Sequence, residues 1–145
     1  MTRMIFINLP VTDLDRSIAF YEAIGAVKNP MFSDDTAACM VISDVIHVML
    51  LTHPKWATFT DRAIPDANKS AQVLLCVSEE SRDAVDAAVK AATGAGGLAD
   101  PTPTQDFGVM YGRSYADPDG HIWEVMWMDP AAAAQGAEVL ETAGA

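Results

Sequence analysis

The hydrophobic pattern of this chain alternates between short β-rich runs and stretches with helical spacing. After a first apolar run, Leu14, Ile18 and Tyr21 recur at the spacing of one helix face. Asp13 stands where an N-cap is expected, and Gly25 can end this helix. The runs that predict strands in this half of the chain are 4–11, 37–43 and 45–51.

The second half of the chain repeats this order. Residues 72–77 predict a strand, and Ser78 is a candidate N-cap for a helix that buries Val85 and Val89. Two further runs, 109–116 and 121–128, predict a hairpin. Its connection reads Asp117-Pro118-Asp119-Gly120, which is typical of a type I turn followed by a glycine with positive φ.

The repeated order predicts an α+β fold made of two tandem βαβββ modules. Their strands should form a curved, cup-like sheet with the helices on its outer face. We expect one domain over residues 1–130, followed by a flexible tail over 131–145. Within the domain, module one spans 3–53, a polar linker spans 54–70 and module two spans 71–129.

Side chains alternate along a strand, so each strand offers one face to the helices and one to the cup. Ile5, Ile7 and Leu9 suit the helix side of the first strand, which leaves Phe6 and Asn8 on the open face. The same alternation places two more polar residues there, Gln72 and Glu124. The open face is therefore predicted to hold a pocket in which a few polar groups converge.

Composition limits the classes of partner. The 145 residues carry a formal net charge of −11, which argues against nucleic acid and anionic membranes and is compatible with a cationic ligand. No apolar run is long enough to span a membrane, and the first ten residues do not resemble a signal peptide. Cys39 and Cys76 lie in apolar runs and are predicted to be buried, reduced thiols of a cytoplasmic protein.

Two motifs, "NLPVTDLDRSIAFYEAIG" near the start and "DPDGHIWEV" near the end, resemble the vicinal-oxygen-chelate superfamily. This superfamily includes glyoxalase I, bleomycin-resistance proteins and extradiol dioxygenases, and the resemblance covers roughly residues 3 to 129. Further segments, such as "FSDDTAACMVIS" and "MYGRSYADPDGHIWEVMWMDP", look like a bacterial branch labelled predicted lactoylglutathione lyase. The resemblance implies a small-molecule pocket in the cup.

The resemblance also implies where a metal would be held. Enzymes of the superfamily use a divalent metal bound by one residue from each of four strands, and substrate oxygens chelate it. The corresponding positions here are Phe6, a residue at or near Met49, Gln72 and Glu124. Phe6 cannot coordinate and a thioether is a poor ligand for such metals. We therefore expect no cofactor, and keep a divalent metal held by Glu124 and Gln72 as the alternative.

Glu124 is the strongest candidate for chemistry, as a general base, a remnant metal ligand or an anchor for a cation. A carboxylate in an apolar pocket suits proton transfer. The structural alternative is that it pairs with Arg113 on the neighbouring strand, or with Gln72. Tyr111 and Arg113 share a face, and Arg113 is the candidate for binding an anionic substrate group. His47 shares a face with Met49 and could be a displaced ligand or an ordinary structural histidine.

Three functional hypotheses follow. The preferred one is a small-molecule pocket without the usual metal site, with Phe6, Asn8, His47, Met49, Gln72, Tyr111 and Arg113 as binding candidates. The first alternative is a metal-dependent lyase or isomerase of the lactoylglutathione-lyase type. The second is a metal-free enzyme that uses Glu124 as base. In each case we expect a homodimer, because an isolated cup would expose apolar surface.

Overall fold

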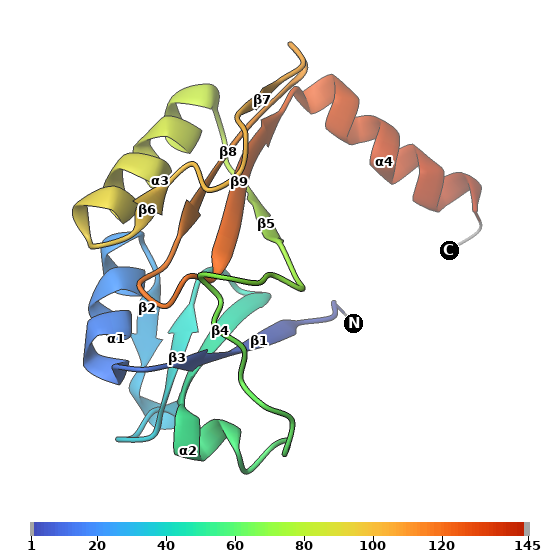
Figure 1. The fold of residues 1–145 in the computed structure, drawn as a ribbon. Helices are drawn as coiled ribbons and strands as arrows, with labels where there is room; N and C mark the ends of the chain where they lie inside the picture. The colour runs from blue at the N-terminus through green and yellow to red at the C-terminus, as the bar shows by residue number, and fades with distance from the viewer. Residues whose placement is uncertain (1, 144–145) are drawn as a thin grey trace.

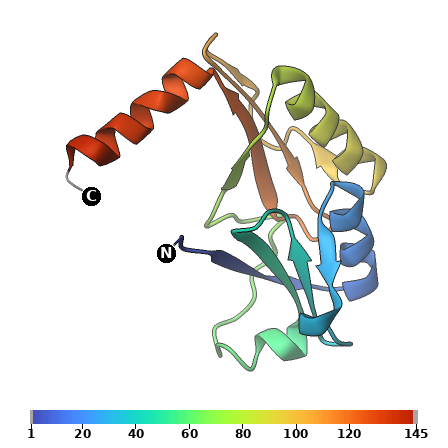
Figure 2. The same ribbon diagram turned by 180° about the vertical axis from the view of Figure 1, so that it is seen from behind.

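The computed structural model describes residues 2–143, with the side chains of 136–141 outside the description. It confirms a mixed α+β architecture with two modules, each a curved sheet carrying one long helix (Figure 1). In both views, α1 (Leu14–Ala23) and α3 (Arg82–Gly94) lie on the same side of the sheets (Figures 1 and 2). The opposite side of the sheets carries the linker and α4 (Pro130–Thr142).

The first sheet has the strand order β1-β4-β3-β2. Strand β1 runs parallel to β4, and the remaining neighbours are antiparallel. The short strand β2 was not predicted, because three residues carry no readable alternation. The elements of this module are β1 (Ile5–Val11), α1, β2 (Val27–Asn29), the 3₁₀ helix η1 (Pro30–Phe32), β3 (Ala37–Val41) and β4 (Ile46–Thr52).

The second sheet repeats the parallel pairing of its first and last strands, with the order β5-β9-β8-β6 and β7 paired to β8. This repetition agrees with the repeated element order of the sequence. A short helix, α2 (His53–Trp56), opens the linker. The remaining elements are β5 (Leu75–Ser78), α3, β6 (Leu98–Ala99), β7 (Gln105–Asp106), β8 (Met110–Ala116), β9 (Ile122–Met128) and α4.

Two local predictions in module two were wrong. Ser78 does not cap α3, because it still belongs to β5 and the next amide, that of Glu79, bonds the Met126 carbonyl at 2.7 Å. The N-cap is Ser81, whose hydroxyl accepts from the Ala84 amide at 3.0 Å. Cys76 is exposed rather than buried, since it lies on the open face of β5, whereas Cys39 is buried as predicted.

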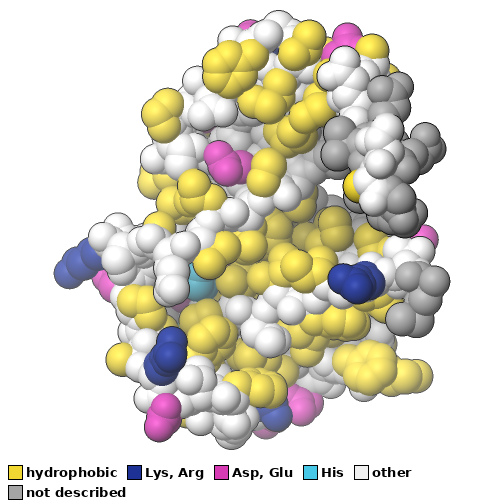
Figure 3. All heavy atoms as spheres, turned by 90° about the vertical axis from the view of Figure 1, so that its right-hand side faces the viewer, with side chains coloured by type: hydrophobic (Ala, Val, Ile, Leu, Met, Phe, Trp, Pro, Cys, Tyr) yellow, Lys and Arg dark blue, Asp and Glu magenta, His cyan; other side chains and the backbone are white. Residues whose placement is uncertain are grey.

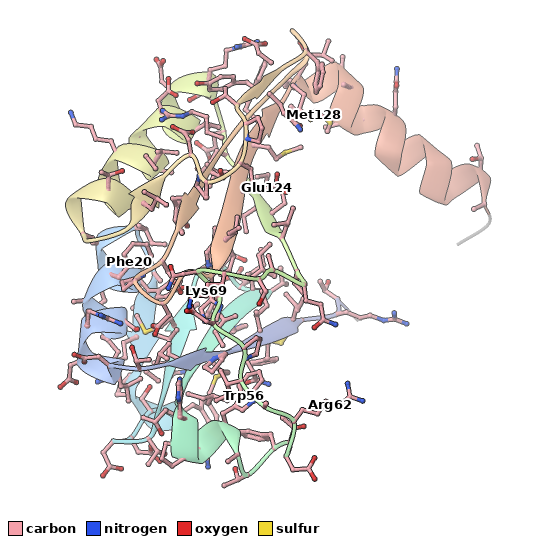
Figure 4. All side chains as sticks on the ribbon, viewed as in Figure 1. Phe20, Trp56, Arg62, Lys69, Glu124 and Met128 are labelled. Carbon is pink, nitrogen blue, oxygen red and sulfur yellow. The ribbon has the colours of Figure 1, made fainter. Side chains whose placement is uncertain are left out.

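The core lies between the helices and the sheets. Alternate residues of β9, Trp123 and Val125, are each 1% exposed, while Glu124 between them is only partly buried. Phe20 on α1 packs into the same core, between the helix and the strands (Figure 4). Burying these side chains favours the fold through the hydrophobic effect and leaves the other face of each strand without a helix.

The turn between β8 and β9 joins the two modules through hydrogen bonds. Gly120 has φ +97° and its amide bonds the Asp117 carbonyl at 2.9 Å, which confirms the predicted turn. Asp119 accepts from the Thr12 amide at 2.9 Å and the Thr12 hydroxyl at 2.8 Å, at the start of α1. His121 Nε2 lies 2.8 Å from the Pro10 carbonyl oxygen. The two family-like motifs therefore contact one another, and these contacts are structural.

Beneath this turn lies a buried polar network. The Tyr21 hydroxyl donates to Asp117 Oδ2 at 2.7 Å, and Trp123 Nε1 donates to the Tyr21 hydroxyl at 3.0 Å. The other oxygen of Asp117 accepts from the amides of Asp119 and His121 at 3.0 and 2.9 Å. Burial raises the pKa of the Asp117 carboxyl above its ordinary value. Every polar atom of this network is satisfied, as the cost of burial requires.

In the described part of the chain, no helix is both long and apolar enough to cross a membrane.

Candidate functional site on the helix-free face

The helix-free face of the sheets is the candidate site. Figure 3 looks onto this side, where hydrophobic side chains cover much of the centre and charged groups are few. Large apolar side chains are exposed on this face, including Phe6 of β1 at 53% and Leu74 before β5 at 50%. Ile5, predicted for the helix side of β1, is 53% exposed at the start of the strand instead of buried. Monomeric proteins rarely leave such contiguous apolar surface uncovered, so the face suits a ligand or a partner.

The first module brings four of the candidate residues to this face. In the parallel register of β1 and β4, Phe6 stands opposite His47 and Asn8 stands opposite Met49. The Phe6 and His47 rings stack with centroids 4.6 Å apart. His47 Nε2 lies 3.3 Å from the Asp44 carbonyl oxygen, and its buried Nδ1 has no partner in the described structure. Alternation therefore predicted the face of these residues correctly. At the first of the four metal-ligand positions, however, Phe6 offers no donor atom and stacks on the His47 ring instead.

Glu124 comes from the middle of β9, on the side away from α3 (Figure 4). It stands beside Cys76 on β5 and Ser114 on β8. With Gln105 and Met126, it lines a depression of about 180 Å³. Within the described residues, the Glu124 carboxylate has neither a hydrogen bond nor an ion pair. A half-buried charge without a protein partner is available to a ligand.

Cys76 is a site residue that sequence reasoning did not select. Burial raises the pKa of its thiol, and the charge of Glu124 raises it further. A raised pKa disfavours the thiolate, the reactive form of cysteine, so the Cys76 thiol borders the carboxylate as a small, weakly polar group. The alternation that placed Glu124 on the open face also indicated Cys76, whereas Gln105 lies on the short strand β7, which no pattern predicts.

Arg113 and Tyr111 do not face Glu124. This differs from the structural alternative in which Arg113 pairs with Glu124. Arg113 stands opposite Val125 in the hairpin register, on the helix side of the sheet. Its guanidinium bonds Asp100 at 2.7 Å and Asp86 at 3.0 Å, and the Tyr111 hydroxyl donates to Asp86 at 2.6 Å. The hydrogen bond from Arg113 lowers the pKa of the Asp100 carboxyl. The proposed Arg113–Glu124 pair is therefore absent, and Arg113 is occupied by two carboxylates.

A second hollow lies under the linker. It has a volume of about 270 Å³ and is predominantly apolar, with Asn8, Gln72 and His121 among its polar residues and Trp56 on the α2 side. Trp56 is the last residue of α2, which lies below the strands in Figure 4. Gln72 and Asn8 thus share a cavity, as predicted, but Glu124 lines a different one. The three polar groups do not converge on a single point.

The donors at the four strand positions do not fit a catalytic metal. Gln72 precedes Cys76, the register partner of Glu124, by four residues, which is about 13 Å along an extended chain. One ion cannot bridge groups this far apart, and Phe6 supplies no donor atom. Among the residues that the structure describes, no three His, Cys, Asp or Glu side chains are grouped closely enough to hold a metal ion. A catalytic zinc usually has three protein ligands.

The sequence matches the model of a known protein family. The model of the Glyoxalase/Bleomycin resistance protein/Dioxygenase superfamily matches residues 3–125. The chain belongs to this superfamily. The match supports the broad resemblance of the two sequence motifs, and leaves the lactoylglutathione lyase branch as a prediction. No curated protein matches the chain.

Several solved structures share the fold. A hypothetical protein from S. aureus is 24% identical, with a TM-score of 0.72 over 88% of this chain and 94% of its own. A family enzyme from Burkholderia phytofirmans is 16% identical, with a TM-score of 0.71 over 88% and 99%. The fosfomycin resistance protein FosX from Listeria monocytogenes is 17% identical, with a TM-score of 0.62 over 88% and 91%. At these identities the similarity concerns the fold.

Proposed function

We propose that this glyoxalase-superfamily protein binds a small organic cation on its helix-free face, with Glu124 as the anchoring carboxylate. The observation that carries the proposal is the half-buried Glu124, which has no partner in the described chain and shares its depression with both apolar and polar residues. Arg113 also lines this depression, but its guanidinium is paired with Asp86 and Asp100. A cationic ligand would form an ion pair with the Glu124 carboxylate. Because the site is partly buried and its dielectric constant is lower than that of water, this ion pair would be stronger than in water. The net charge of −11 would add long-range attraction.

The proposal treats the pocket as metal-free. The positions that hold metal in the superfamily carry Phe6, Met49, Gln72 and Glu124, and a lyase built on them would lack a sufficient set of donors. A metal-free enzyme in which Arg113 orients the substrate is also disfavoured, because Asp86 and Asp100 already bind Arg113. The names of the relatives, resistance to bleomycin and to fosfomycin, favour a role in binding small molecules.

We expect Glu124→Gln to weaken binding of a cationic ligand at least tenfold, or about 1.4 kcal/mol. The substitution keeps the shape of the side chain and removes its charge. Isothermal titration should use bleomycin and spermidine as cations and fosfomycin as an anion. Glu22→Gln, an exposed position on α1, is the matched control and should leave affinity unchanged.

Three results would contradict this proposal. They are binding of fosfomycin as tight as that of the cations, equal affinity in the Glu124→Gln variant, and no heat with any of the probes. Elemental analysis of protein purified without chelator would decide the metal separately. About one equivalent of a divalent metal per chain, lost on Glu124→Gln, would favour the lyase alternative.

We also propose that the functional form is a homodimer, which would cover exposed apolar side chains of the helix-free face such as Phe6 and Leu74. Light scattering coupled to gel filtration should then give twice the chain mass. A monomeric mass at micromolar concentration would contradict it.

A further inference from the structure

A separate cavity lies between the two modules, and no step of the proposed function uses it. Its volume is about 550 Å³. It is enclosed by the end of α1, the connection between β3 and β4, the end of β5 and the first turns of α3. It shares no lining residue with the Glu124 depression or with the hollow under the linker. Its walls are partly polar, and their apolar residues include Ile24, Ala26, Ile42, Ile46, Val77 and Trp123.

Tyr115 brings an unpartnered hydroxyl to this cavity. The residue is 3% exposed and lines the cavity wall. The other two tyrosines of the chain donate their hydroxyl protons, Tyr21 to Asp117 and Tyr111 to Asp86. In the described structure the Tyr115 hydroxyl forms no hydrogen bond. It is not a fully enclosed atom, because the one fully enclosed polar side-chain atom without a partner there is His47 Nδ1. The Tyr115 hydroxyl must therefore keep some accessible surface, which the cavity provides.

Two carboxylates complete the polar part of the cavity. Glu79 is half-buried, Glu80 is exposed, and both line the space. Burial raises the pKa of the Glu79 carboxyl, and the neighbouring charge of Glu80 raises it further. Burial also raises the pKa of the Tyr115 phenol, and the Glu79 charge adds to this effect. Glu79 and Tyr115 both line the cavity, and they are the two partly or fully buried polar side chains that we consider as its binding groups.

The balance of charge in the cavity is negative. The residues that line it include no Lys, Arg or His, and neither glutamate forms an ion pair within the described structure. An anionic ligand would meet two like charges. A bare metal ion would find two carboxylates, fewer donors than metal sites usually offer. An organic cation matches both the charge and the apolar residues of the walls, because its body can be buried while its head is paired.

We propose that the cavity between the modules binds an organic ammonium ion, whose charged head lies between Glu79 and Tyr115. The ammonium group would donate to the Glu79 carboxylate and to the Tyr115 hydroxyl oxygen. Its apolar body would lie against the isoleucine and valine side chains of the walls. This site is independent of the Glu124 site, because the two share no residue.

The test is titration of the full-length chain with 4-phenylbutylamine, followed by ¹⁵N–¹H NMR. We expect saturable shifts of the amides of residues that line the cavity, which are 42, 43, 46, 77–80, 84 and 88. The neutral isostere 4-phenylbutan-1-ol should bind at least tenfold more weakly, because it lacks the charge. Glu79→Gln should weaken amine binding at least fivefold, and Tyr115→Phe should weaken it by about twofold to fivefold.

Two further variants make the outcome decisive. Ala88→Phe projects a ring into the cavity from α3 and should abolish the shifts, while circular dichroism verifies that the variant is folded. Glu124→Gln should leave amine binding in this cavity unchanged. Equal binding of amine and alcohol, no shifts in the cavity residues, or loss of binding in Glu124→Gln alone would each overturn the proposal. The last result would assign the amine to the helix-free face.

Discussion

Replacing Asp117 by alanine should lower the free energy of unfolding by about 3–5 kcal/mol. Asp117 accepts hydrogen bonds from the Tyr21 hydroxyl and from the amides of Asp119 and His121. Its removal would leave three donors without an acceptor in a region that is almost fully buried. It would also release the turn that holds β8 and β9 against the start of α1. Urea unfolding monitored by circular dichroism gives the measurement.

Tyr21→Phe isolates one arm of this network. It removes the hydroxyl that links Asp117 to Trp123 and should cost about 1–2 kcal/mol. The double variant should be less destabilised than the sum of the two single variants, because both remove the same bond. Additive losses would show that the Tyr21–Asp117 contact contributes nothing of its own.

The pH dependence of this network has a definite sign. The pKa of Asp117 is raised in the folded chain, chiefly by burial, so the fold favours its protonated form. Its contribution to stability is therefore fully present below the unfolded pKa and is lost as pH rises through the folded value. In Asp117→Asn this contribution is absent. The stability difference between the wild type and this variant should thus move in favour of the wild type as pH falls toward the ordinary range of an aspartate.

The second large effect is expected for Gly97→Ala, which should destabilise the fold by about 2–3 kcal/mol. A Cβ at this position would lie 2.6 Å from the Ala116 carbonyl oxygen and 2.9 Å from that of Ala92. It would also approach Phe20 Cε2 at 2.9 Å. Two of these three neighbours are backbone, which cannot move without disturbing α3 or β8. Thermal and urea unfolding would measure the loss.

Gly94→Ala is the matched control. Gly94 is the last residue of α3, its Cβ would meet nothing within 4 Å, and its φ is not positive. Alanine there should be neutral or stabilise the helix by about 0.5–1 kcal/mol. If Gly97→Ala and Gly94→Ala had the same free energy of unfolding, the close packing of α3, β8 and Phe20 around Gly97 would be contradicted.

Local features of the chain were predictable because they depend on short stretches of backbone. The Asp13 side chain accepts from the Arg16 amide at 3.0 Å, as its position before an apolar helical stripe indicated. The turn at Gly120 follows from the Asp-Pro-Asp-Gly sequence. The opposite orientation of Trp123 and Glu124 follows from the alternation of side chains in any strand.

The candidate site was predicted only in part, because its partners come from distant segments. Arg113 bonds carboxylates on α3 and after β6, and nothing in its own strand reveals that choice. The separation of Gln72 from Glu124 depends on the register of β5 against β9, which pairs Cys76 with Glu124. The family resemblance indicated equivalent positions but not the distance between them.

The order of residues alone thus determines the two-module α+β fold, the turn, and the face on which Glu124 lies, since propensity and alternation act within a few residues. Tertiary packing decides that Glu124 has no partner among the described residues, that Arg113 is bound on the other face, and that a cavity opens between the modules. These features depend on how segments far apart in the chain dock against one another, and short-range patterns carry no information about that docking.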